Sequence, residues 1–460
     1  FKENDRINHQ FILAMWGEVL KQEGASKEKI AECYRKAVIL TIPDAEKVWW
    51  EKRPLSVLEM NLLLETQTEN LKICEKAIDK LRDAGRTYYL VELLEIEIQI
   101  LETMPEDAVT EHLEKNGTDR INAKELMSMI KNLYAEYEVP AYMQDCTYFY
   151  QQKWIFSMKD VLRTRREMFG LTQEQLCEGI CSVKSLRRAE KGQTDMQRET
   201  LKKLLNRLGL SGQMQWSRLI TSDREVIRMA EELADYINDR KFSVASKQLE
   251  SLKSRIDLDI PQNKQYFLEK QALLEFEQGK VTREEFVKME KEALECTLRA
   301  ENLYRKENVY LTEREIICIS NSWKGMEEKE KRESINLILR LYDNYALNNG
   351  LSQAISVYEI VTEAAVNELG NNGEHVRAEE IDRKSIKASL SCRRVWDIHY
   401  KIYDILWNEK EIQKKNKEKN QNMEMTDGLM KCISISHYAK QHFHEKIYRE
   451  KMINLYIQDN

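Results

Sequence analysis

The chain has 460 residues, of which 42% are hydrophobic and 33% are charged, and its formal net charge is −6. These values are typical of a globular protein with room for two or three domains and exclude a largely disordered chain, while the absence of any run of about 18 apolar residues excludes a predicted membrane span. Only 5 prolines and 15 glycines interrupt a chain rich in helix-forming residues, which predicts an all-α fold.

Residues 1–115 are expected to form a helical-repeat region whose sequence recurs 256 residues later. Ser26–Ile30 corresponds to Thr282–Phe286, and the further pairs at this offset are Ala37 with Ala293, Thr41 with Thr297, and Leu55 with Leu311. A fixed offset of this kind predicts an internal duplication, in which residues 1–115 are the remainder of a first unit. It also predicts a further helix-turn-helix domain about 100 residues upstream of Phe1.

Residues 116–155 are expected to form a tyrosine-rich junction, because Gly117 and Pro140 break the helical pattern on either side. The aromatic residues of this stretch lack interleaved basic residues, so packing in a core or between domains is favoured over base stacking. They are Tyr134, Tyr137, Tyr142, Tyr148, Phe149, Tyr150 and Trp154.

Residues 156–210 are expected to form a compact domain of four or five helices. Within it, Leu171–Gly192 reads as two short helices separated by a tight turn. Thr172 can cap the first of them and Ser182 the second, because a hydroxyl accepts a hydrogen bond from a free backbone N–H. Two capped starts ten residues apart predict a helix-turn-helix.

The stretch from Met158 to Leu210 resembles the helix-turn-helix of the Cro and lambdoid-repressor (XRE) family. Its short turn, Gly179–Ser182, is similar to that of the Rgg- and PlcR-type regulators, which join this domain to tetratricopeptide repeats that bind signalling peptides. The resemblance implies that Val183, Lys184 and Arg188 read base edges in the major groove.

The resemblance also implies that Glu190 ties the domain together and that several residues contact or flank the DNA backbone. Those residues are Thr172, Gln173, Ser182, Ser185, Arg187 and Lys191. Lys184 and Arg187 suit phosphate contacts alone equally well. The chain departs from the family pattern at Val183 and Lys184, where polar reading residues are usual, and at Met196, where a proline is usual.

Charge singles out the same domain. Residues 158–210 contain twelve Lys and Arg against seven Asp and Glu, a net charge of +5, so the remainder of the chain carries −11. Since an acidic surface repels DNA, this distribution concentrates any polyanion binding on the one basic module.

Residues 214–410 are expected to form a tetratricopeptide-like region of paired helices. Ser222 and Glu225 form a predicted capping box at the start of the first helix. Two apolar stripes then face each other, which resembles the tetratricopeptide pattern without its regular 34-residue period and favours an irregular α-solenoid. The stripes comprise Val226, Met229, Leu233, Tyr236, Ile237, Phe242, Ala245, Leu249 and Leu252.

Residues 411–460 are expected to form a loop and C-terminal helices. His437, His442 and His444 lack a carboxylate pattern for metal binding, so a surface or core role is favoured. The nine cysteines are scattered apart from Cys177 and Cys181, as expected of reduced thiols in a cytoplasmic protein. We predict no catalytic residue, metal site or cofactor, because no phosphate loop, nucleophile elbow or kinase signature is present.

Two functions remain open from the sequence. The first is a transcriptional regulator that binds double-stranded DNA and whose repeats sense a peptide or mediate dimerisation, with a short signalling peptide and a homodimer partner implied by the family resemblance and no membrane association. The second is a helical-repeat adaptor for a protein partner, in which the helix-turn-helix is degenerate. The sequence does not identify residues of a peptide-binding groove.

Overall fold

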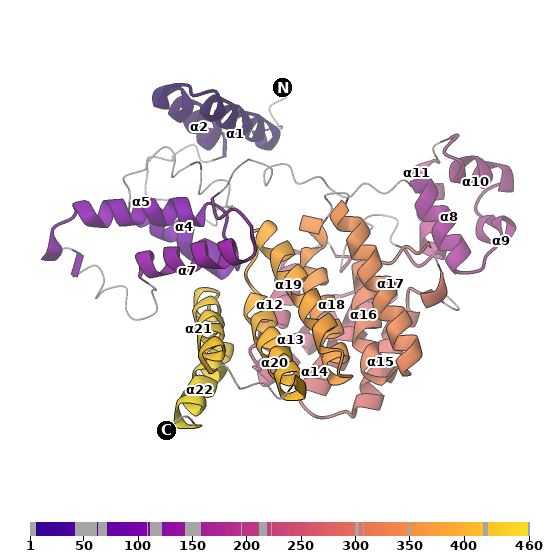
Figure 1. Ribbon diagram of the computed structural model, residues 1–460. Coiled ribbons are helices and arrows are strands. Elements are labelled where there is room, and N and C mark those ends of the chain that lie inside the picture. The colour runs from indigo at the N-terminus through magenta and orange to yellow at the C-terminus, as the bar shows by residue number, and fades with distance from the viewer. Residues whose placement is uncertain are drawn as a thin grey trace. The chain divides into compact units, whose positions relative to one another are not determined.

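The structure is a computed structural model, and the residues that it describes consist of α-helices, two short 3₁₀ helices and connecting turns, without a β-strand (Figure 1). The predicted all-α fold is confirmed. No helix in the described part of the chain is both long and apolar enough to cross a membrane. The described residues are 6–41, 62, 71–107, 109–110, 122–142, 158–194, 196–210, 219–221, 223–299, 303–306, 308–347, 351–416 and 422–458.

The chain packs into two compact units, of which the first is discontinuous in sequence. It combines Phe1–Gln152 with Glu379–Asn460, so the C-terminal helices share a core with N-terminal ones, an arrangement that the linear segments expected from the sequence do not anticipate. Its helices are α1 (Arg6–Gln22), α2 (Lys27–Thr41), α4 (Leu71–Asp83), α5 (Leu90–Thr103), α7 (Ala123–Glu136), most of α19 (His375–Ser391), α20 (Ile398–Asn416), α21 (Asn422–Tyr438) and α22 (His442–Gln458).

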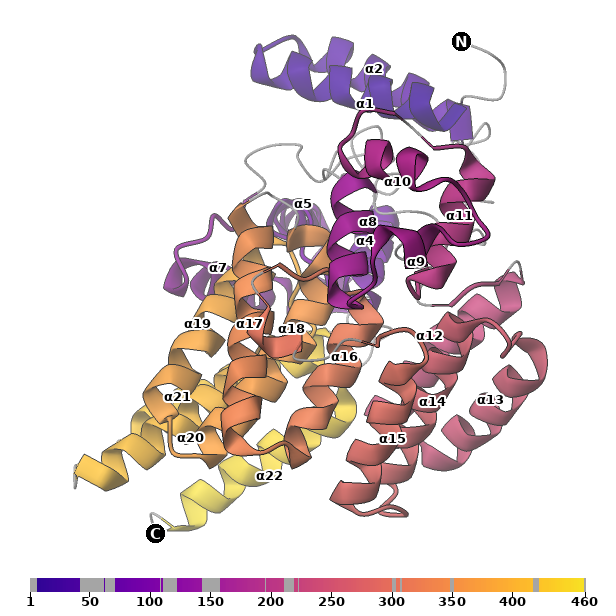
Figure 2. The same cartoon turned by 90° about the vertical axis from the view of Figure 1, so that its right-hand side faces the viewer.

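The second unit, Lys153–Ala378, contains the expected helix-turn-helix followed by a row of helices (Figure 2). From α12 to α16 each helix packs against the next, and α17 and α18 continue the row. After the helix-turn-helix, the elements are α12 (Arg224–Asn238), α13 (Phe242–Arg255), α14 (Pro261–Glu277), α15 (Arg283–Glu295), η3 (Leu303–Arg305), α16 (Glu313–Ser322), η4 (Trp323–Gly325), α17 (Glu328–Leu347) and α18 (Leu351–Asn371).

The predicted apolar stripes of α12 and α13 meet in one core. Val226, Leu233 and Leu252 are fully buried there, and Tyr236 and Phe242 pack against its edge. The start of α12 differs from the prediction. Asp223 is the N-cap, and its side chain accepts a hydrogen bond from the backbone N–H of Glu225 at 2.9 Å, whereas the predicted cap, Ser222, lies outside the described residues.

The aromatic residues of the predicted junction divide in the structure. Tyr134 and Tyr137 are buried in the core of the first unit, which supports packing over base stacking for these two, while Tyr142 is exposed. Tyr148, Phe149, Tyr150 and Trp154 lie outside the described residues.

The internal duplication has a structural counterpart. In the first unit α1 packs against α2, and in the second unit α14 packs against α15, with α2 and α15 beginning at residues 27 and 283. Thr282 closes a capping box with Glu285 at the start of α15. The offset of 256 residues therefore relates two helix pairs of the same kind.

Candidate DNA-binding interface

Four short helices form the domain that the sequence singles out, namely α8 (Met158–Met168), α9 (Gln173–Cys177), α10 (Val183–Glu190) and α11 (Arg198–Arg207). Each is too short to be stable in isolation, so their shared core must hold them. Leu186 and Ala189 are buried, as the sequence predicts for the inner face of α10. The other buried apolar residues of the domain include Val161, Leu162, Met168, Leu176, Leu204, Leu205 and Leu208.

Both predicted caps are present at the ends of the turn. Thr172 forms a capping box with Gln175, in which the Thr172 hydroxyl accepts from the Gln175 N–H at 3.2 Å and the Gln175 side chain accepts from the Thr172 N–H at 2.8 Å. The Ser182 hydroxyl accepts from the Ser185 N–H at 3.2 Å. Between them Gly179 has φ +68°, a left-handed conformation that glycine adopts without strain and that reverses the chain.

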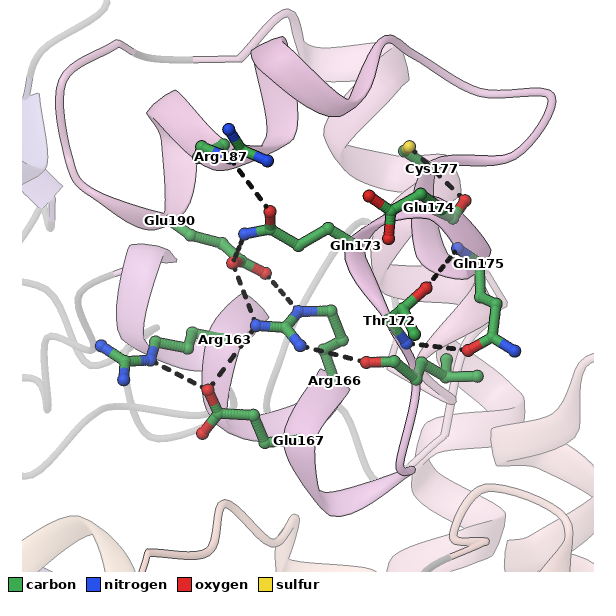
Figure 3. A network of polar contacts seen from close by, with 11 residues as sticks. Arg163, Arg166, Glu167, Thr172, Gln173, Glu174, Gln175, Cys177, Arg187 and Glu190 are labelled. Carbon is green, nitrogen blue, oxygen red and sulfur yellow. Dashed lines mark hydrogen bonds and ion pairs between the residues drawn. The ribbon is translucent and has the colours of Figure 1, made fainter.

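A polar network joins α8, α9 and α10 behind the turn (Figure 3). Arg166 donates to both carboxylate oxygens of Glu190, at 2.7 and 3.1 Å, and Gln173 donates to Glu190 at 2.7 Å. Arg187 in turn donates to the side-chain oxygen of Gln173 at 3.3 Å. Glu190 thus ties the domain together, as the resemblance implies, and it sets the orientation of α10 against α9.

The outer face of α10 carries basic side chains without protein partners. Lys184 and Arg188 are exposed, and neither side chain makes a hydrogen bond or ion pair with any residue that the structure describes. They lie four residues apart, so they project from the same side of the helix. Val183 is half-buried beside them. The three predicted base-reading residues therefore occupy one accessible face.

The predicted phosphate contacts fall into two groups. Thr172, Gln173, Ser182 and Arg187 already take part in caps or in the polar network, although all but Gln173 are exposed. Lys191 is exposed just after α10. Ser185 is also exposed, and its hydroxyl lies 2.8 Å from that of Ser182.

The cysteines and histidines give no sign of metal chemistry. Cys177 and Cys181 are free cysteines, and partial burial raises the pKa of the Cys181 thiol, which keeps it protonated at neutral pH. His437 and His442 approach the carboxylate of Glu445 at 3.0 and 3.7 Å. Within the described ranges no group of three or more His, Cys, Asp or Glu side chains could hold a metal ion.

Sequence reasoning missed the residue that joins this domain to the helical row of the same unit. Arg165 in α8 is fully buried and pairs with the equally buried Glu315 in α16. Its guanidinium also donates to the backbone carbonyls of Leu208, Tyr310 and Thr297 at 3.0, 2.9 and 3.1 Å. All five N–H groups therefore have acceptors.

A close backbone approach supports the same junction. Gly209, just after α11, has φ +72°, and a Cβ atom there would lie 1.9 Å from the carbonyl oxygen of Thr297. The carbonyl of Gly209 accepts from the Gln262 side chain at 3.1 Å. No residue with a side chain fits at position 209 without moving the two segments apart.

Comparisons with known proteins agree with this geometry. Residues 162–213 match the family model described as a helix-turn-helix, so the chain contains a helix-turn-helix domain. One similar solved structure is that of PlcR from Bacillus thuringiensis in complex with the peptide PapR7 and DNA, with 16% identity and a TM-score of 0.38 over 64% of this chain and 98% of that chain. No curated protein sequence is significantly similar to the chain.

Proposed function

We propose that the chain is a cytoplasmic DNA-binding transcriptional regulator, which acts by binding rather than by catalysis. The observation that carries the proposal is the outer face of α10 in a helix-turn-helix domain, where Lys184 and Arg188 are exposed and have no partners among the described residues. Helix-turn-helix proteins place such a helix in the major groove, where an arginine can make two hydrogen bonds to guanine.

The polar network behind α10 supports this role. Arg166 and Glu190 are largely buried, so their paired hydrogen bonds hold the helix in one orientation before DNA arrives. A preorganised helix loses less conformational entropy on binding than a mobile one. Lys184 and Arg188 can therefore be presented to the groove together.

The test is a selection of bound sequences from random double-stranded oligonucleotides, followed by affinity measurements. We expect a preferred sequence, and we expect Arg188→Ala to weaken binding by about 1–3 kcal/mol at one base pair only. Arg163→Ala is the matched control, because Arg163 is exposed on α8 and pairs with Glu167 at 3.0 Å. Selection of no preferred sequence would contradict the proposal and favour the adaptor function.

The sensing role of the repeats is supported by a pocket in the second unit. It has a volume of about 1550 Å³, larger than the roughly 300–1000 Å³ of a typical small-molecule pocket and of a size for a peptide. Phe169 at the end of α8 lines it together with residues of the helical row, so a ligand there would touch the DNA-binding domain and the repeats at once. Lys264, Lys291, Glu292 and Glu330 give its wall both signs of charge.

A pool of short synthetic peptides incubated with the full chain tests this role, with mass spectrometry of the retained peptides as the readout. We expect Glu292→Lys to change which peptides are retained, because the charge of the pocket wall is reversed. Glu284→Lys is the matched control on α15, since Glu284 is exposed and does not line the pocket. Retention of no peptide would contradict sensing and leave DNA binding untouched.

A further inference from the structure

Two segments of the first unit have the same structure at an offset of 308 residues. Helix α4 ends at Asp83 and α5 begins at Leu90, while α19 ends at Ser391 and α20 begins at Ile398. The turn between each pair contains a left-handed residue at the equivalent position, Gly85 with φ +56° and Arg393 with φ +53°.

The backbone hydrogen bonds of the two turns also correspond one to one. Arg86 donates to the carbonyl of Leu81 at 2.8 Å, and Arg394 donates to that of Ser389 at 2.9 Å. The N–H of Leu90 donates to Thr87 at 3.3 Å, and the equivalent bond of the second segment has the same length. Both turns therefore have the same fold, although few of their residues are identical.

Burial follows the same register in both segments. Ten buried positions of the first, from residue 74 to residue 97, coincide with ten buried positions of the second, from 382 to 405. In the first segment they are Cys74, Ala77, Ile78, Leu81, Arg82, Leu90, Val91, Leu93, Leu94 and Glu97, and in the second Asp382, Ser385, Ile386, Ser389, Leu390, Ile398, His399, Lys401, Ile402 and Ile405.

The two segments pair with each other reciprocally. Thr87 donates from its N–H to the carbonyl of Arg393 at 3.1 Å, and Val395 donates to the carbonyl of Gly85 at 2.9 Å. Adding 308 to the residue numbers of the first bond, and subtracting it across the pair, produces the second bond. The bonds flank an antiparallel bridge between Arg86 and Arg394, which are themselves equivalent. Such self-complementary pairing is the mark of a local two-fold axis.

A third helix from each side completes the symmetry. The ring of Tyr134, in α7, lies 5.0 Å from the guanidinium of Arg393 in the other segment. Tyr438, in α21, donates its hydroxyl to the carbonyl of Arg86 at 2.7 Å. Both tyrosines are fully buried, so each half contributes one aromatic side chain to the turn of its counterpart.

We propose that this surface is a homodimer-type interface that the chain satisfies internally, so that the full chain is a single-chain pseudo-dimer and a monomer in solution. A two-fold interface uses the same patch on both partners, and here both patches belong to one chain. The partner that fits the surface formed by α4, α5 and α7 is the duplicate formed by α19, α20 and α21. This arrangement replaces the homodimer that the family resemblance implied.

The mass of the full chain in solution is the first test. Sedimentation velocity should give 54.5 kDa at every concentration. A mass of twice that value which falls on dilution would overturn the proposal, because it would mean that the patches pair between chains.

Cross-linking locates the pairing directly. Glu136 and Lys431, and likewise Glu138 and Lys387, form ion pairs at 2.9 Å between the two halves, so a zero-length carbodiimide can join them. We expect both cross-links in a band of single-chain mass on a denaturing gel. The same cross-links in a band of double mass, or no cross-link between these residues, would contradict internal pairing.

A glycine pair supplies a matched perturbation. A Cβ on Gly85 would lie 2.6 Å from the Trp396 ring across the axis, whereas one on Gly24, at φ +70°, would meet nothing within 4 Å. We expect the Thr87 and Val395 amides to exchange with solvent at least tenfold faster in Gly85→Ala than in Gly24→Ala. Equal exchange rates in the two variants would count against the pairing, and the wild-type cross-links decide the matter if Gly85→Ala does not fold.

Discussion

At the scale of single residues, Arg165 shows how a buried charge can join two parts of one unit. Neither its guanidinium nor the carboxylate of Glu315 is exposed to solvent. Burying two charges costs several kcal/mol for each ion, and only complete pairing offsets that cost. The Thr297 hydroxyl adds a further hydrogen bond to Glu315 at 2.8 Å, so the carboxylate is well satisfied. The pair therefore specifies one arrangement of α8 against α16.

Removing one member of this pair should be costly. We expect Arg165→Leu to lower the free energy of unfolding by about 3–5 kcal/mol, because Glu315 would be left as an unpaired buried charge. Urea denaturation followed by circular dichroism measures the change. The double variant Arg165→Leu, Glu315→Leu should recover most of the loss, and a single variant that costs less than about 1 kcal/mol would contradict the interpretation.

His399 predicts a pH dependence of the first unit. It is fully buried, its Nδ1 lies 2.9 Å from the Tyr448 hydroxyl, and its Nε2 contacts the side-chain oxygen of Gln441. Burial lowers the pKa of His399 from 6.5 to about 3, and the nearby charges of His444 and Lys401 act in the same direction. The folded protein thus holds this imidazole neutral, while the unfolded chain protonates it near pH 6.5.

Stability should consequently fall as the pH is lowered from about 6.5 towards 3, because protons bind preferentially to the unfolded state. We expect His399→Gln to flatten this part of the pH profile by an amount on the order of a few kcal/mol. Urea titrations at a series of pH values measure it. His442→Gln, at an exposed histidine, is the control and should leave the profile unchanged.

At the scale of elements, α10 depends on its surroundings. Its eight residues are fewer than an isolated helix needs, so the Ser182 cap, the buried Leu186 and the network at Glu190 must stabilise it together. The same three features orient the side chains that are proposed to read DNA. Stability of this helix and affinity for DNA should therefore change together.

We expect Ser182→Ala to cost about 0.5–2 kcal/mol in stability, because the Ser185 N–H loses its acceptor. DNA binding should weaken without a change in the preferred sequence, since Ser182 itself only caps the helix. Thermal unfolding and DNA titration measure the two effects. Ser185→Ala is the matched control, because it removes an exposed hydroxyl and keeps the capped N–H, and an equal loss in both variants would contradict the capping role.

The helices that the sequence predicts correctly are those with local signals. The capped starts at Thr172 and Ser182 and the apolar stripes of α12 and α13 are encoded within a few residues, so pattern and chemistry identify them. The cap of α12 was misplaced by one residue because Ser222 and Asp223 are adjacent and both are good caps.

Contacts between distant segments carry no such signal. Arg165 stands next to Arg166 in a basic stretch, and nothing local indicates that one reaches Glu190 while the other pairs with Glu315, 150 residues away. The two-fold pairing was equally hidden. Its buried positions are apolar in one segment and polar in the other at several places, as at Leu81 and Ser389, so the duplication shows in the structure rather than in residue identity.

At the scale of the whole molecule, charge is distributed unevenly. Residues 158–210 carry a net charge of +5 and the remainder of the chain carries −11. DNA binding releases counterions in proportion to the phosphates that are neutralised, so affinity should fall steeply with salt. Because acidic surfaces repel DNA, the phosphate contacts should come from the helix-turn-helix domain alone.

Single lysine substitutions separate local contacts from net charge. We expect Lys191→Gln to reduce the slope of log affinity against log salt by about 1 on every DNA sequence, because one phosphate contact is lost. Lys329→Gln changes the net charge equally but lies on α17, where the residue is exposed and outside the basic module, so its slope should equal that of the wild type. Fluorescence anisotropy titrations over a series of salt concentrations measure both slopes. If the two variants shifted the slope equally, the overall charge of the chain would govern binding, and the basic module would lose its special role.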